Sequence, residues 1–204
     1  MKLLKKELKR LKYNKMNKYQ SILIDLRNSD DNEITKNLQD LKNNYLNCLE
    51  EDGTFWILTN FKREKNEMLP IPFEICNKFT NNFLKNIILV PDFNNISEGI
   101  FFDNCTYLIL FFSKNKKYYF NKDPIREKHI WKDVEWGKRK KNYHPLGKDP
   151  GNVWIKTEDD GKGKITNHIL LPFEEVIGRI IKSSSKNNED FLLINFKENK
   201  WNIR

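Results

Sequence analysis

The sequence predicts an α/β fold in which helices cover both faces of a mainly parallel sheet. Short apolar runs alternate along the chain with stretches of helical periodicity, the order typical of such folds. The runs over Thr106–Ser113 and Phe191–Phe196 are almost continuously apolar, as expected of strands that are buried on both faces. The chain has 204 residues, of which 38% are hydrophobic and 13% aromatic. This composition suits one domain with a buried core and is too apolar for a disordered chain.

The predicted strands and helices follow one another in a regular order. They are a strand over Ser21–Asp25, a helix over Ile34–Leu49, a strand over Thr54–Thr59, a helix over Phe73–Leu84, strands over Asn86–Val90 and Thr106–Ser113, a helix from Pro172 through Lys182, and a strand over Phe191–Phe196. Apolar side chains recur on one side of each helix, as Val176, Ile177 and Ile180 do in the last one. Turns are expected at Asp52-Gly53 and Asp160-Gly161, and a loop over 92–104.

The formal charge of +9 is concentrated in two places. Residues 1–18 contain eight basic residues and one acidic residue, and residues 114–148 contain twelve basic and four acidic residues. The rest of the chain is therefore neutral to acidic. We expect a basic N-terminal extension or helix over 1–18 and a single domain over 19–204, with a basic and aromatic insert at about 114–156.

The insert has the composition of a nucleic-acid-binding segment. Seven aromatic residues between positions 114 and 154 are interleaved with the cations. Cations attract the phosphate backbone, and aromatic faces can stack on exposed bases. The candidate contacts are Lys116, Lys117, Arg126, Lys128, Trp131, Trp136, Lys138, Arg139, Lys140, Lys141, Tyr143, His144 and Lys148. We expect double-stranded DNA as the partner, although the composition alone leaves RNA open.

The N-terminal stretch is a different kind of basic segment. Leu4, Leu8 and Leu11 fall on one stripe of a short helix that is surrounded by lysines. A DNA-contacting helix, a partner-docking helix and a solubilising end all remain open.

Several classes of protein and site are not expected. The three cysteines, Cys48, Cys76 and Cys105, are odd in number and far apart, which argues against a disulfide framework and a zinc site. The three histidines have no metal-ligand spacing with them, so no metal is expected. No apolar run reaches the roughly 20 residues of a membrane span, and no export signal is visible. The sequence therefore predicts an intracellular protein, in the cytoplasm or nucleoid, or in a nucleus.

Several stretches resemble the DNA methyltransferases that methylate adenine N6 or cytosine N4, in the order that puts the catalytic half first. The most specific is His144-Pro145-Leu146-Gly147-Lys148-Asp149-Pro150-Gly151-Asn152-Val153-Trp154, which is similar to a recurrent Gly-Lys-x-Pro-Gly-Asp-Val-Trp segment of that family. Weaker likenesses lie at 51–57, at 106–114 and in the helix after His168. The resemblance covers roughly residues 19–196 and implies a Rossmann-like methyltransferase sheet with a target-recognition insert.

Two motifs of the family are degenerate in this chain. The catalytic motif is Asp-Pro-Pro-Tyr or a near relative, and the matching positions read Asp25, Leu26, Arg27 and Asn28. Both prolines and the aromatic platform for a flipped base are absent. The family's loop for S-adenosylmethionine reads Asp-Pro-Phe before a glycine run, and the matching positions read Ile194, Asn195 and Phe196 with bulky residues after them. The chain ends at Arg204, before the rest of the family's cofactor half.

The resemblance therefore implies a catalytically inactive subunit, with no catalytic and no cofactor-binding residues of its own. Such a subunit would bind DNA and pair with a complete methyltransferase that holds S-adenosylmethionine, contributing DNA binding, target recognition or stability to a heteromer in restriction-modification or epigenetic methylation. Two alternatives stay open. One is an active but divergent methyltransferase that uses Asp25, and the other is a stand-alone DNA-binding relic or decoy.

Overall fold

The computed structural model describes residues 18–29, 34, 38, 42, 45–64, 67–92, 105–130, 143–186, 191–197 and 200–203. Its elements are β1 (Tyr19–Asp25), η1 (Leu46–Cys48), β2 (Leu49–Thr59), β3 (Lys62–Glu64), β4 (Glu67–Leu69), α3 (Ile71–Lys78), β5 (Phe83–Pro91), β6 (Thr106–Ser113), η2 (Asp123–Ile125), β7 (Lys156–Asp159), β8 (Ile165–Ile169), α4 (Phe173–Ser184), β9 (Phe191–Lys197) and β10 (Lys200–Ile203). The predicted helix over 1–18 and most of the predicted loop over 92–104 lie outside the described residues.

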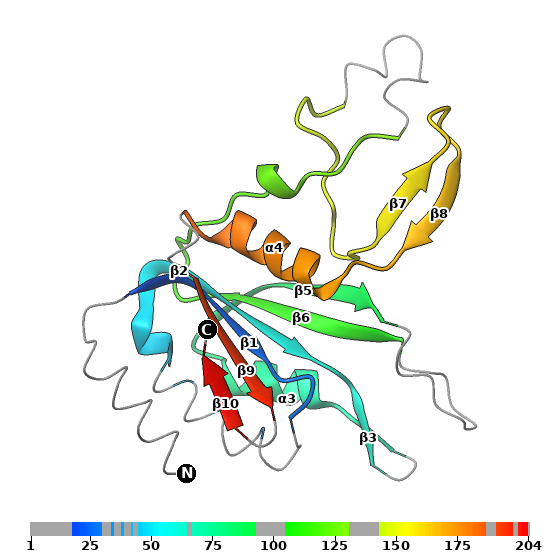
Figure 1. Cartoon of the computed structure of the whole chain (residues 1–204). Coiled ribbons are helices and arrows are strands. Elements are labelled where there is room, and N and C mark those ends of the chain that lie inside the picture. Colours follow the sequence, from blue (N-terminus) through cyan, green and yellow to red (C-terminus); the bar gives the residue numbers. More distant parts are fainter. Residues whose placement is uncertain are drawn as a thin grey trace.

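Within the described part of the chain, the main sheet has six strands in the order β10-β9-β1-β2-β6-β5 (Figure 1). β9, β1 and β2 are parallel neighbours. β6 is antiparallel to both β2 and β5, so β5 runs in the same direction as β2. β10 is antiparallel to β9. Four strands thus share one direction, which confirms the mainly parallel α/β sheet.

Each face of the sheet carries its own apolar core. On one face, Phe55, Phe112 and Ile22 pack with residues of α3 and with helical positions of 34–45. On the other, Trp56 and Leu23 pack with Val176 and Ile180 of α4 and with residues of the insert. Figure 1 shows α4 and α3 on opposite sides of the sheet. The alternation of side chains along β2 therefore sends neighbouring aromatic residues into different cores.

Cross-strand aromatic pairs hold the centre of the sheet. Trp56 faces Phe111 with ring centroids 3.9 Å apart, and Phe55 faces Phe112 at 4.8 Å, with both ring pairs nearly parallel. Both pairs link β2 to β6, which are far apart in sequence. Such pairs stabilise a sheet beyond the burial of their area.

Two predicted helices and one predicted turn differ from the structure. The helix over Ile34–Leu49 ends earlier, because Leu46–Cys48 form a 3₁₀ turn and Leu49 begins β2. The turn at Asp52-Gly53 is instead part of β2, where the register against β1 jumps from Tyr19↔Leu49 to Ser21↔Thr54. The turn residues thus lie in a bulge, at which Gln20 Nε2 donates to the carbonyl oxygen of Asp52 at 3.2 Å.

The helix over Phe73–Leu84 is the third correction. α3 begins at Ile71 and ends at Lys78, and polar residues 80–82 form a turn before β5 begins at Phe83. Phe83 and Leu84 then pair with Ser113 and Phe112 of β6. The strand pairing therefore takes the residues that would have extended the helix.

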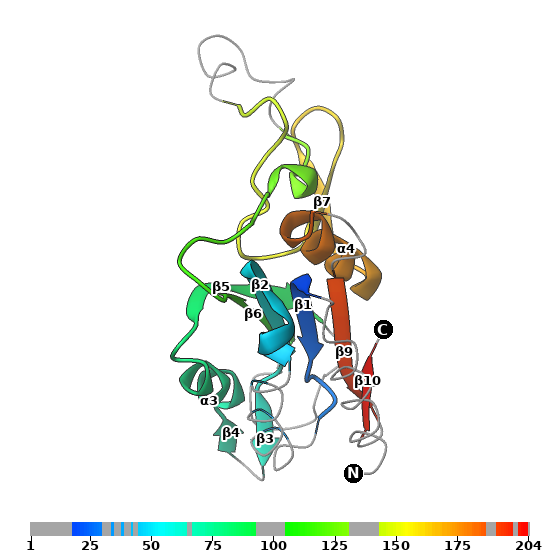
Figure 2. The same cartoon turned by 90° about the vertical axis from the view of Figure 1, so that its left-hand side faces the viewer.

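The insert and the β7–β8 hairpin extend from the sheet beyond α4 (Figure 2). The expected turn at Asp160-Gly161 closes this hairpin, since Asp159 Oδ1 accepts the amide of Gly161 at 2.7 Å. The sequence does not predict β7 and β8, nor the polar β3–β4 hairpin, because their side chains lack a buried apolar face. It does not predict the short strand β10 either.

Candidate functional site

Asp25 ends β1 at the carboxyl edge of the sheet. It pairs in register with Leu58 of β2 and with Asn195 of β9, and the next amide, that of Leu26, donates to the carbonyl oxygen of Leu58 at 2.9 Å. In open α/β sheets, ligands usually bind outside the carboxyl ends of the parallel strands. The catalytic position implied by the resemblance therefore stands at the usual ligand-binding edge.

The Arg27 side chain turns back onto Asp25 and engages both carboxylate oxygens. Arg27 Nε donates to Oδ1 at 2.9 Å, and Nη2 donates to Oδ2 at 2.8 Å. The main-chain amide of Arg27 also donates to Oδ1, at 3.1 Å. The side chains of Arg27 and Asp25 are only 17% and 9% exposed. This is the fork-on-fork geometry in which a guanidinium binds a carboxylate most strongly.

Two aromatic rings from distant parts of the chain cover the guanidinium. Its central carbon lies 4.0 Å from the ring centroid of Phe173, at the start of α4, and 4.7 Å from that of Tyr107, in β6. Both distances are within the range of cation–π attraction. Leu26 is buried, whereas Asn28 is exposed. The four positions of the degenerate motif thus form a closed ion pair, an apolar anchor and a surface amide.

The electrostatics of this cluster favour the ionised pair. Burial would lower the pKa of the Arg27 guanidinium, but the hydrogen bond and the charge of Asp25, with contributions from Tyr107 and Asp92, raise it above its ordinary value. Burial raises the pKa of Tyr107 to about 12; the Arg27 charge opposes this shift, and the Asp25 and Asp92 charges add to it. Tyr107 therefore stays neutral at physiological pH.

The Tyr107 shift predicts a loss of stability in strong alkali. Below pH 10 the Tyr107 phenol is protonated in both the folded and the unfolded chain, so its full contribution to the free energy of unfolding is present. Between about pH 10 and 12 it ionises in the unfolded chain only, and the free energy of unfolding falls, by about 2 kcal/mol. Urea unfolding at pH 9 and pH 11 should show a smaller fall for Tyr107→Phe than for the wild type. Equal falls in the two proteins would contradict the shift.

The end of β9 does not fit S-adenosylmethionine in the manner of the family. Ile194, at the position of the family's acidic residue, is fully buried in the apolar core. An isoleucine side chain has no group that could hydrogen-bond a cofactor. Lys197 already pairs with Lys200, so the chain reverses directly from β9 into β10 where the family has a glycine-rich loop.

The candidate nucleic-acid contacts do not form one cluster. Lys116 and Lys117 are exposed in the loop after β6. This loop lies at the amino ends of β1 and β2, since the amide of Tyr119 donates to the carbonyl oxygen of Asp52. Asp25 is at the opposite edge. Trp131, Trp136, Lys138, Arg139, Lys140 and Lys141 lie outside the described residues.

The remaining candidates surround a bridge between two segments of the insert. Glu127 and Lys148 exchange backbone hydrogen bonds of 2.9 and 2.7 Å. Arg126 stabilises this bridge, because its Nε donates to Asp123 Oδ1 at 2.6 Å and its Nη1 donates to the Gly147 carbonyl oxygen at 3.2 Å. The Arg126 side chain is only 9% exposed. Arg126 is therefore committed to the fold of the insert, and the Lys148 side chain is exposed.

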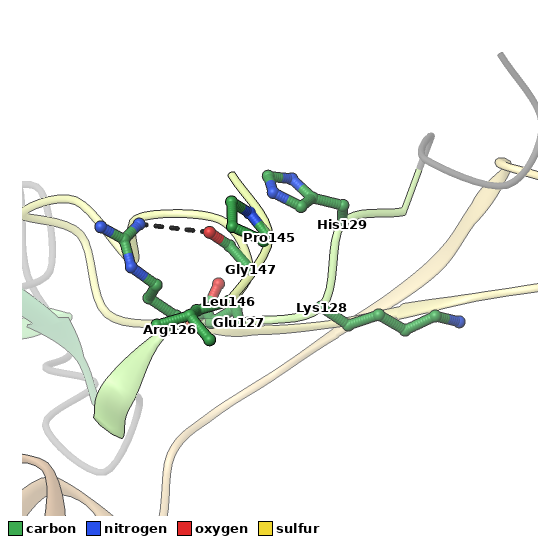
Figure 3. A pocket seen from close by; sticks show the side chains of 7 residues that line it. All are labelled: Arg126, Glu127, Lys128, His129, Pro145, Leu146 and Gly147. Carbon is green, nitrogen blue, oxygen red and sulfur yellow. Dashed lines mark hydrogen bonds between the residues drawn. The ribbon is translucent and has the colours of Figure 1, made fainter. Parts of the chain in front are cut away.

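A pocket of about 300 Å³ lies on one side of the bridge, between residues 126–129 and 145–147 (Figure 3). His129 Nε2 lies 3.1 Å from the carbonyl oxygen of His144, and the His129 ring contacts that of Tyr143 at 4.8 Å. His144 itself is exposed, and its Nδ1 accepts the Leu146 amide at 3.2 Å. The structure thus brings Tyr143, His144 and His129 together at this rim.

A second pocket, of about 310 Å³, separates the β7–β8 hairpin from α4. Exposed Lys128, Lys148 and Lys156 line it, and Lys128 Nζ lies 3.5 Å from Asp159 Oδ2. At its base, Arg179 pairs with Glu127 at 3.0 Å and with Glu175 at 3.4 Å. Lys156 and Arg179 were not among the sequence candidates, because their proximity depends on how the hairpin packs against α4.

The segment most similar to the family motif attaches the insert to the sheet. The amide of Leu89, in β5, donates to the Asn152 carbonyl at 2.8 Å, and the amide of Trp154 donates to the Leu89 carbonyl at 2.9 Å. Asp149 Oδ1 accepts the Gly151 amide at 3.0 Å, and Asp149 also pairs with Lys122. The Trp154 side chain is 2% exposed and lies in the core beneath α4.

Gly147 of this segment has no room for a side chain. Its φ is +116°, and a Cβ would lie 2.4 Å from the Glu127 carbonyl oxygen. Gly147→Ala should therefore destabilise the protein by about 2–3 kcal/mol in urea unfolding. Gly151 has a φ of +71° but open space around it, so Gly151→Ala should cost only about 1 kcal/mol. Equal costs would show that contact with Glu127 is unimportant.

The described residues hold neither a metal-binding cluster nor a membrane-spanning helix. No cluster of His, Cys, Asp and Glu side chains there has the arrangement of a metal site. None of the helices in the described ranges is long and apolar enough to cross a membrane.

Comparisons with known proteins agree with this fold. The chain is similar to the cytosine-N4-specific PvuII DNA methyltransferase, with a TM-score of 0.51 and 12% identity over 87% of this chain and 68% of that one. It is also similar to the M1.HpyAVI–SAM complex, with a TM-score of 0.48 and 18% identity over 88% and 72% of the two chains. No curated protein sequence matches it. Residues 13–192 match the DNA methylase model of N6 and N4 methyltransferases. The chain therefore belongs to the N6/N4 DNA methylase family.

Proposed function

We propose that this protein is a DNA-binding member of its family that does not transfer methyl groups, and that it works in complex with a catalytically complete methyltransferase. The observation that carries the proposal is the Asp25–Arg27 pair, in which both carboxylate oxygens are engaged by one guanidinium. The Arg27 guanidinium neutralises the charge of the Asp25 carboxylate, and three hydrogen bonds already occupy most of its roughly four acceptor sites, so Asp25 is poorly placed to receive the amino group of a base.

The end of β9 supports the same conclusion for the cofactor. Ile194 is a core residue, and β9 reverses directly into β10. We expect S-adenosylmethionine to be held by the partner. The partner would supply methyl transfer, and this chain would supply DNA contact, target choice or stability.

The DNA-binding part of the proposal rests on the lysines around the second pocket. Lys128 and Lys148 of the insert and Lys156, the first residue of β7, are exposed and line this pocket together. The β7–β8 hairpin leads into α4, whose first residue, Phe173, covers the Asp25–Arg27 pair. DNA bound across the hairpin would therefore approach the carboxyl edge of the sheet. Lys116 and Lys117 are at the other edge.

This placement predicts unequal effects of charge reversal. Lys148→Glu with Lys156→Glu should weaken DNA binding about tenfold or more and reduce the slope of log K against log salt by about 2. Lys116→Glu with Lys117→Glu is the matched control, and it should change both quantities much less. Fluorescence anisotropy with a labelled duplex at several salt concentrations measures both. A larger effect of the control pair would move the DNA surface to the opposite edge.

The proposed subunit role is tested by recovering the tagged full chain from its native host and measuring the mass of the intact complex. A second polypeptide in equal amount, carrying an intact Asp-Pro-Pro-Tyr-type motif, is the expected result. Recovery of the chain alone, or with nucleic acid only, would contradict the subunit role and would favour a stand-alone DNA-binding protein.

A further inference from the structure

We propose that Asp25, Tyr107 and Phe173 form a receptor for a planar guanidinium group, and that Arg27 is its resident ligand. The inference rests on the proposed function, because it concerns the same site and gives the reason that Asp25 is unavailable there. It adds that the receptor is a binding site in its own right, which persists when the Arg27 side chain is removed.

The shape of the site matches a flat, forked cation. A carboxylate lies in line with two N–H groups, and it receives them on separate oxygens, at 2.9 and 2.8 Å. Aromatic centroids lie 4.0 and 4.7 Å from the guanidinium carbon. An ammonium group is compact and offers no planar surface and no fixed fork. The site therefore distinguishes guanidinium from other cations of equal charge.

The receptor is assembled from parts of the fold that do not depend on Arg27. Asp25 is fixed by the pairing of β1 with β2 and β9, Tyr107 by the pairing of β6 with β5, and Phe173 by the start of α4. The main-chain amide of Arg27 also donates to Asp25 Oδ1 at 3.1 Å, and any residue at this position except proline keeps that bond. Truncating the Arg27 side chain should thus leave Asp25, Tyr107 and Phe173 in place around a cavity.

Burial and charge explain why Arg27 occupies this receptor. The side chain is only two residues from Asp25, so it binds with a high effective concentration. A guanidinium is also weakly hydrated and pairs with a mostly buried carboxylate at a lower desolvation cost than an ammonium. The neutral Tyr107 phenol and the nearby Asp92 carboxylate add no competing positive charge.

The test is chemical rescue of Arg27→Ala in the full chain. The variant should melt at a lower temperature than the wild type, and methylguanidinium chloride should restore part of the loss. At ten times its dissociation constant the ligand should raise the melting temperature by about 4 °C. Tetramethylammonium chloride at equal concentration, and methylguanidinium added to the wild type, should give no rise. Absence of any selective rise in a folded variant would overturn the inference.

Two further variants test whether methylguanidinium acts at this site and not elsewhere in the protein. In Arg27→Ala combined with Asp25→Asn, methylguanidinium should have no effect, because the anionic carboxylate is gone. Arg126→Ala also removes a guanidinium paired with an aspartate, but Asp123 is 43% exposed and no ring contact accompanies that pair among the described residues. It should show no rescue. Equal rescue of Arg126→Ala would contradict a specific receptor.

A measurement on the wild type keeps the inference testable if Arg27→Ala does not fold. The Nε–H of Arg27 should exchange with water at least tenfold more slowly than that of free arginine under the same conditions. Equal exchange rates in side-chain NMR would overturn the inference. Methyl transfer by the wild type would instead contradict the proposed function and leave the rescue result standing, so the two failures are distinguishable.

Discussion

Asp25→Asn should destabilise the protein by about 3 kcal/mol, an effect on folding rather than on a reaction rate. The substitution leaves the Arg27 guanidinium mostly buried without the carboxylate that is hydrogen-bonded to it, and breaking one side of a buried ion pair usually costs 3–5 kcal/mol. The lower end of that range applies because the Arg27 side chain is 17% exposed and retains some hydration. Urea unfolding at neutral pH measures the cost.

A double-mutant cycle separates the pair from its surroundings. Arg27→Leu should cost a similar amount, because Asp25 is then left unpaired. The double variant Asp25→Asn with Arg27→Leu should cost less than the sum of the two, with a coupling of about 2 kcal/mol. A coupling near zero would mean that the Asp25–Arg27 ion pair does not stabilise the fold. It would contradict the claim that Arg27 holds Asp25.

Trp154→Ala should cost about 3–5 kcal/mol, the usual loss when a buried tryptophan is truncated. The side chain is 2% exposed, its Nε1 donates to the Gly151 carbonyl at 3.2 Å, and Arg179 lies over its ring at 5.6 Å. The loss should also loosen the insert, because the buried indole holds in place the segment whose main chain bonds to Leu89 of β5.

The neighbouring residue is the control for Trp154. Val153 is 50% exposed, so Val153→Ala should change the free energy of unfolding by no more than about 0.5 kcal/mol. Limited proteolysis should cut the insert faster in Trp154→Ala than in Val153→Ala. A cost below about 1 kcal/mol for Trp154→Ala would show that this segment does not attach the insert to the sheet.

The central strands and α4 could be predicted because their patterns are strong and local. β6 has the bounds that its apolar run indicates, and α4 differs by only a residue or two at its start and end. The errors arose where pairing between distant segments decides the structure. Asp52-Gly53 is a common turn sequence, but the Gln20 side chain and the β1 ladder hold it in a bulge.

The candidate site could be predicted only in part, for the same reason. The resemblance to the family implies that Asp25 and Arg27 lie in a degenerate catalytic motif, and their separation by one residue allows contact. It does not indicate Tyr107 and Phe173, which reach the guanidinium from β6 and α4. The candidate DNA contacts form one continuous segment of the sequence, but the fold divides the described ones between the loop after β6 and the part of the insert that lies beyond α4.

The most direct test of the central claim is a methyl-transfer assay with the purified full chain, radiolabelled S-adenosylmethionine and unmethylated DNA. Because Arg27 holds Asp25 and the end of β9 does not fit the cofactor, we expect no incorporation of label above that of the Asp25→Ala variant, at any enzyme concentration that keeps the chain folded. Incorporation by the chain alone that Asp25→Ala abolishes would contradict the account. It would identify an active, divergent methyltransferase that uses Asp25.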